Sequence, residues 1–269
     1  MSENIKFEMI LKSATGLPMV KINREEFLKS ALQKHYDSAT ISKAISQNPA
    51  MAGISVEKIN EIAKSCINYE TTKVTAISAL AGIPGGAAMI GTVPADLAQY
   101  FGHMLRILQK LIYLYGWQEL FEEDGTMDDE TANLLTLFTG VMFGVSGATS
   151  AISKIAETAA QKTAKSLAQK ALTKGAIYPI VKKIATALGV KMTKTIFARG
   201  VSKVIPVIGG VASGGLTFAT YKPMAKKLQK YLSSLELADP KHYADQPDVI
   251  ESDCENAIEV ECITVDENN

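Results

Sequence analysis

The stretch GIPGGAAMIGTVPAD (82–96) places a proline and paired glycines in the middle of an otherwise apolar segment. Proline lacks a backbone amide donor and glycine is costly in a helix, so a straight helix cannot continue through this point. A second stretch, VIPVIGG (204–210), repeats the same arrangement. We therefore expect two apolar helical hairpins, and we assign their structural hinges to six residues, Pro84, Gly85, Gly86, Pro206, Gly209 and Gly210.

The rest of the chain carries the signals of helix starts and ends. Asn23 is followed three residues later by Glu26, which is the capping-box pattern, and Ser55 precedes a long amphipathic run that ends at Gly82. No segment shows the sustained alternation of a strand. We predict an all-α fold, a compact multi-helix bundle, with helices over 23–36, 41–46, 56–81, 94–116, 131–153, 154–175 and 222–237 and two shorter ones between the last two.

A formal net charge of zero conceals two halves of opposite sign. Residues 239–269 contain ten acids and one base, a net charge of −9, which leaves +9 for residues 1–238. We expect three parts: an N-terminal segment (1–22), a helical domain (23–238) and an acidic, disordered tail (239–269). Because a basic body attracts anionic surfaces, we assign membrane or anion binding to Lys162, Lys165, Lys170, Lys182, Lys183, Lys191, Lys194 and Lys203.

Three apolar runs, 74–95, 131–153 and 204–221, are nearly long enough to raise the question of membrane insertion. Two of them contain Gly-x-x-x-Gly spacing, which lets helix backbones approach closely in membranes and in soluble bundles alike. The interpretations are a buried helical core, a peripheral or partly inserted membrane protein, and a multi-pass protein. Aromatic residues are only 7% of the chain, which argues against interfacial belts.

The helix expected over 94–116 carries a narrow polar stripe. Asp96, His103 and Arg106 fall on one face, together with Gln99 and Lys110, within an arc of about 80°. Asp96 could orient His103 for proton transfer while Arg106 binds an anion. The same stripe could instead be a buried polar seam or a solvated face, with Asp96 serving the helix N-terminus. Tyr113 and Tyr115 are expected to fill the core with their hydroxyls bonded nearby.

Other motifs of catalysis and ligand binding are not found in the sequence. The glycines at 82–86 lack the Lys-Ser/Thr ending of a phosphate-binding loop, and GVSG (144–147) is too short for a nucleophile elbow. Three scattered histidines and three scattered cysteines lack metal-ligand spacing. The lysine-rich region of residues 154–203 contains a single arginine, Arg199, and no stacking motif. We expect no metal, no cofactor and no nucleic-acid partner, and the sequence favours a non-enzymatic protein. It shows no secretory signal.

The segment ALAGIPGGAAMIGTVPADLAQYFGHMLRILQKLIYLYGW (79–117) resembles the central signature of the EcsC family. The run VIPVIGGVASGG, followed by a basic helix, is similar to the C-terminal part of that family. The resemblance covers residues 23–235 and leaves out the acidic tail. It implies a bacterial protein, cytoplasmic or membrane-peripheral, from a family named after a protein encoded beside an ABC transporter. The family has no established catalytic residues, so none is assigned by the resemblance.

We therefore expect a helical protein that associates reversibly with the inner face of the cell membrane and has an accessory role in transport or secretion. The expected partner is an anionic membrane surface or a membrane protein. The alternative is an enzyme or small-ligand binder that uses Asp96, His103 and Arg106 in an internal cavity.

Overall fold

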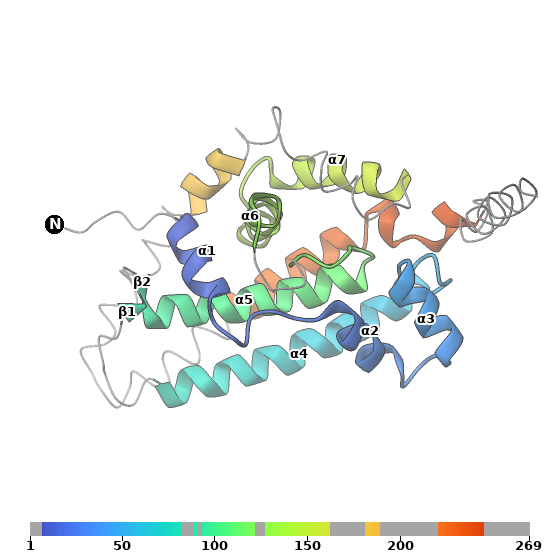
Figure 1. The fold of residues 1–269 in the computed structure, drawn as a ribbon, viewed down its shortest axis with the longest axis horizontal. Coiled ribbons are helices and arrows are strands. Elements are labelled where there is room, and N and C mark those ends of the chain that lie inside the picture. Colours follow the sequence, from blue (N-terminus) through green and yellow to red (C-terminus); the bar gives the residue numbers. More distant parts are fainter. Residues whose placement is uncertain are drawn as a thin grey trace, which may run out of the picture.

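The all-α prediction is confirmed in the part of the chain that the computed structural model describes (Figure 1). That part comprises residues 7–81, 89–90, 93–121, 127–161, 181–188 and 220–244, with the side chains of 76–81, 89–97, 158 and 161 left out. Within it, the only strand pairing joins two residues to two, β1 (Met89–Ile90) to β2 (Val93–Pro94), in antiparallel register. All six predicted hinge residues lie outside the described residues.

Helices account for most of the described chain. In order they are α1 (Phe7–Thr15), α2 (Arg24–Leu32), α3 (Ser38–Ser46), α4 (Val56–Ala81), α5 (Ala95–Leu114), α6 (Asp129–Phe143) and α7 (Ala148–Gln161). Residues 181–188 and 220–232 are also helical. Two short 3₁₀ turns, η1 (Glu236–Ala238) and η2 (Pro240–Tyr243), close the described part.

Local capping explains where several of these helices start. The Asn23 side chain accepts a hydrogen bond from the Glu26 amide (2.8 Å), and Ser55 Oγ accepts one from the Lys58 amide (3.3 Å). Asp128 caps α6 by accepting from the Thr131 amide (2.7 Å). Each bond satisfies an amide that has no partner inside its own helix. The capping roles predicted for Asn23 and Ser55 are therefore confirmed.

Helix α5 forms the centre of the core. Its side chains are buried almost without interruption from Ala98 to Leu114, and α4 runs antiparallel beside it (Figure 1). The segment that follows α1 crosses α5 at Gly102. A Cβ on Gly102 would lie 3.0 Å from Val20 Cγ2 and 3.1 Å from Leu17 Cδ1. Residues 7–22 are thus packed on the helical body, although the domain boundaries themselves stay predictions.

The prediction of one helix over 131–153 is wrong. Helix α6 ends at Phe143, and Gly144 takes the left-handed conformation (φ 64°) that favours glycine. The Val145 amide then bonds back to the Gly140 carbonyl (2.8 Å), and Gly147 adds a second positive φ (89°) before α7 begins. The uncharged run suggested one continuous helix, but it contains a turn between two helices. The sequence signal for this turn was the pair of glycines, Gly144 and Gly147.

Gly140 marks the closest approach at this corner, and its substitution gives a first prediction. A Cβ there would lie 2.8 Å from Ile184 Cγ2 and 3.0 Å from Ala148 Cβ, both in the core. Gly140→Ala should lower the free energy of unfolding by about 1–3 kcal/mol through overpacking. Urea denaturation of Gly140→Ala and of a control variant, Gly16→Ala, would measure this. Gly16→Ala is a suitable control because a Cβ at Gly16 meets only ordinary van der Waals contacts, the nearest at 3.5 Å. Equal stability of the two variants would contradict the close approach.

None of the helices in the described part of the chain is both long enough and apolar enough to cross a bilayer.

Candidate functional site

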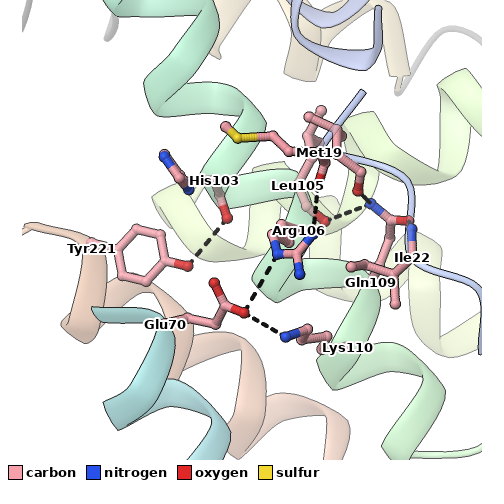
Figure 2. A network of polar contacts seen from close by, with 10 residues as sticks. Met19, Ile22, Glu70, His103, Leu105, Arg106, Gln109, Lys110 and Tyr221 are labelled. Carbon is pink, nitrogen blue, oxygen red and sulfur yellow. Dashed lines mark hydrogen bonds and ion pairs between the residues drawn. The ribbon is translucent and has the colours of Figure 1, made fainter. Parts of the chain in front are cut away.

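Two residues of the polar stripe on α5, Arg106 and Lys110, face α4, where they meet a carboxylate (Figure 2). Glu70 lies in the middle of α4 and is completely buried. Its Oε1 forms an ion pair with Lys110 Nζ and lies 3.5 Å from Arg106 Nε. We call Glu70, His103, Arg106, Lys110 and Tyr221 the buried polar cluster.

Sequence reasoning missed Glu70, although the chain carries a signal for it. The buried positions of α4 recur at helical spacing, at Ile59, Ala63, Ile67, Glu70 and Val74. A glutamate on the apolar stripe of an amphipathic helix is rarely buried unless a cation pairs with it. Its occurrence on that stripe therefore indicated a basic residue on the facing helix.

One carboxylate holds two cations at this site. The Arg106 side chain is 22% exposed and that of Lys110 is 11% exposed, so both are largely withdrawn from water. Arg106 Nη1 also donates to the Met19 carbonyl (2.5 Å), and Lys110 Nζ lies 5.6 Å from the centre of the Phe27 ring. The cluster therefore carries an excess of positive charge around a single buried acid.

Gln109 extends the polar contacts of α5 toward the segment that follows α1. Its Nε2 donates to the carbonyls of Val20 and Leu105 (both 2.9 Å), and its Oε1 accepts from the Ile22 amide (3.1 Å) (Figure 2). Together with the bond from Arg106 to Met19, the contacts with Val20 and Ile22 satisfy backbone groups of a segment that enters the core without secondary structure.

His103 is the other buried polar residue of the stripe. The residue is 3% exposed, and neither Nδ1 nor Nε2 has a hydrogen-bond partner among the residues that the structure describes. Burial lowers the pKa of His103, Glu70 opposes that shift, and the cations of Lys73 and Arg106 reinforce it. The backbone carbonyl of His103 accepts a bond from the Tyr221 hydroxyl (3.1 Å), which joins the helix of residues 220–232 to α5 (Figure 2).

The predicted set Asp96, His103 and Arg106 is only partly placed by the structure. His103 and Arg106 lie one turn apart on α5, but the side chain of Asp96 lies outside the described residues. Arg106 is engaged by Glu70 and Met19. Burial raises the pKa of the neighbouring Cys66 to about 11, so this thiol stays protonated at neutral pH and is a poor nucleophile. The catalytic interpretation of the stripe stays a prediction.

Tyr113 and Tyr115 are buried, as predicted, and both hydroxyls are bonded. Tyr113 donates to Glu119 Oε1 and Tyr115 to Asn60 Oδ1, each at 2.5 Å.

Two helices expose lysines beside the corner between α6 and α7. On residues 181–188, Lys182 and Lys183 are exposed while Val181, Ile184 and Leu188 are buried. The helix of residues 220–232 exposes three more lysines and packs on α7 through Tyr231, whose hydroxyl donates to the Thr149 carbonyl (2.7 Å). We call this set the basic surface: Lys182, Lys183, Lys226, Lys227 and Lys230.

The other six lysines assigned to membrane or anion binding lie outside the described residues: Lys162, Lys165, Lys170, Lys191, Lys194 and Lys203.

Comparison with known proteins gives no match to a family model, to a curated protein or to a solved structure. Membership of the EcsC family therefore stays a prediction from the motifs at 79–117 and 204–215.

Proposed function

We propose that this protein is a non-enzymatic, EcsC-like helical protein that binds reversibly to the anionic inner face of the cell membrane. The observation that carries the proposal is the basic surface, whose lysines stand on helices that bury their opposite sides in the core. The net charge of +9 over residues 1–238 supports the same assignment, because it adds long-range attraction to an anionic surface.

The expected strength of this binding follows from the charges. A lysine near an anionic leaflet contributes about 1 kcal/mol, and this contribution fades within a Debye length of roughly 8 Å at physiological salt. The three lysines of residues 220–232 would therefore account for about 3 kcal/mol, or roughly 100-fold in affinity. Binding of this kind is reversible and sensitive to salt, which suits a peripheral accessory of transport or secretion better than an anchored protein.

Neutralising the lysines of one helix tests the proposal. The triple variant Lys226→Gln, Lys227→Gln, Lys230→Gln should bind vesicles of phosphatidylglycerol and phosphatidylethanolamine about 100-fold more weakly than the wild-type protein. Flotation at several vesicle concentrations measures the affinity. A matched triple variant at Lys29, Lys34 and Lys64, which are exposed on the α2 and α4 side of the molecule, should lose much less.

Two results would contradict the proposal. One is equal flotation of the wild-type protein on anionic vesicles and on neutral phosphatidylcholine vesicles. The other is an equal loss of binding in the two triple variants, which would indicate net charge rather than the basic surface. Circular dichroism of each variant verifies that its helices are intact.

A further inference from the structure

His103 is unusual for a buried polar side chain because its ring nitrogens have no hydrogen-bond partner among the described residues. The residue is only 3% exposed, and the large majority of buried side-chain polar atoms in proteins have such a partner. The neutral ring is tolerated there because it carries no charge. A protonated ring would have two N–H donors and a full charge in the same dry surroundings, at a much greater desolvation cost.

The charged groups around the ring add to that cost. Helix α4 contributes Glu70 and Lys73, α5 contributes Arg106, and the helix of residues 220–232 contributes the neutral hydroxyl of Tyr221. The one carboxylate among them is already ion-paired through Oε1 to Lys110 and close to Arg106. Protonation of His103 would therefore add a further cation to surroundings whose positive charge already exceeds their negative charge.

We propose that the buried polar cluster is an acid-sensitive contact, in which protonation of His103 loosens α5 from α4 and from the helix of residues 220–232. The imidazolium can reach water only if its ring leaves its buried position. The backbone carbonyl of His103 is also the acceptor for the Tyr221 hydroxyl. Displacing His103 therefore releases the buried bond that holds the start of the helix of residues 220–232. This inference is independent of membrane binding, although the released helix carries three lysines of the basic surface.

The direction of the pH effect follows from proton linkage. The pKa of His103 in the folded protein lies below its ordinary value of 6.5, so the unfolded or opened state binds the proton more tightly. The stability that the neutral ring contributes is fully present above pH 6.5 and is lost as the pH falls from there through the folded pKa. Each unit by which the pKa is lowered corresponds to about a tenfold change in the opening equilibrium.

Two measurements on the full chain test the contact. Histidine ring signals, assigned to His103 by their absence in His103→Gln, are titrated by NMR between pH 8 and 5. Native-state hydrogen exchange of residues 221–232, corrected for intrinsic rates, is followed over the same range in both proteins. We expect the His103 signal to titrate below pH 6.5, and we expect exchange to accelerate toward acid pH in the wild-type protein only.

The opposite results are equally clear. A His103 signal that titrates above pH 6.5 would mean that the unpartnered Oε2 of Glu70 captures the imidazolium, and this would overturn the proposal. Parallel exchange profiles in wild type and His103→Gln would overturn it as well. If His103→Gln fails to fold, His103→Asn replaces it both for assigning the ring signal and for the exchange comparison.

Discussion

Replacing Arg24 with methionine should lower the free energy of unfolding by about 3–5 kcal/mol, because it removes every donor from a buried guanidinium site. The guanidinium donates to four backbone carbonyls. Nε reaches Trp117 (3.0 Å), Nη1 reaches Ile45 (2.6 Å), and Nη2 reaches both Ala44 (3.3 Å) and Gln47 (3.2 Å). The residue as a whole is only 5% exposed, so water cannot readily replace these bonds.

The position of Arg24 explains why this loss should be large. Three of its acceptors are at the end of α3, where the last carbonyls of a helix have no intrahelical partner. The fourth follows the end of α5, so a single side chain ties the first residue of α2 to two other helix ends. A cation there also complements the negative end of the α3 dipole.

The carboxylate beside Arg24, that of Glu119, also has hydrogen-bond partners. Glu119 Oε2 accepts from the Arg24 amide (2.8 Å), and Glu119 Oε1 accepts from the Tyr113 hydroxyl (2.5 Å). Burial lowers the pKa of Arg24 and Glu119 raises it, which identifies Glu119 as the counter-charge. Removal of the guanidinium therefore takes a cation away from this carboxylate and leaves the Trp117, Ala44 and Ile45 carbonyls without this donor, whereas the Gln47 carbonyl keeps a bond from Gln118 Nε2 (2.9 Å).

Urea denaturation monitored by circular dichroism would measure the effect. Arg24→Lys should recover only part of the loss, since one ammonium cannot reproduce a fork that reaches four carbonyls. Lys29→Met, at an exposed position of the same helix, should stay within about 0.5 kcal/mol of the wild-type protein. A loss below about 1 kcal/mol in Arg24→Met would show that the four bonds do not hold these helix ends together.

The second large effect is expected at Glu70. Glu70→Gln leaves Arg106 and Lys110 on the inner side of α5 without their shared carboxylate, and the free energy of unfolding should fall by about 2–4 kcal/mol. The value lies below that of a fully buried pair because both cations keep partial contact with water, which screens them. The measurement is again denaturant unfolding, at a constant pH of 7.5.

A double variant separates lost pairing from lost packing. Glu70→Met with Lys110→Met removes the carboxylate and one of its two cations, and keeps side chains of similar length between α4 and α5. Since apolar replacement of a buried pair is often neutral or stabilising, the double variant should be more stable than the sum of the single changes predicts. Strict additivity of the two changes would falsify the ion pair as an energetic contact.

Local signals were sufficient for much of the fold. Asn23 and Ser55 each cap the helix that was expected after them, and α4 ends where Gly82 follows it. These features depend on residues three or four positions apart, so the sequence carries the whole interaction. The division between α6 and α7 was missed because a continuous apolar run was given more weight than the glycines at 144 and 147.

The candidate site was predicted less completely. The stripe on α5 was identified from its periodicity, but its partner Glu70 is 40 residues away from Lys110 in the chain. Arg24 was not singled out at all, because its acceptors are main-chain carbonyls that any residue provides. Main-chain carbonyls are present at every residue, so no sequence pattern identifies those that accept from Arg24. A buried arginine of this kind can be recognised only from the tertiary structure.

By itself, then, the sequence determined that the chain is helical, where most helices begin, and that its charges separate into a basic body and an acidic tail. The tertiary structure alone decided which polar groups of α4 and α5 are enclosed together and which lysines stay on the surface. The physical reason is range. Capping and amphipathic periodicity act within about one or two helical turns. Burial depends on which helices pack together, and burial is what makes Glu70, His103 and Arg24 energetically important.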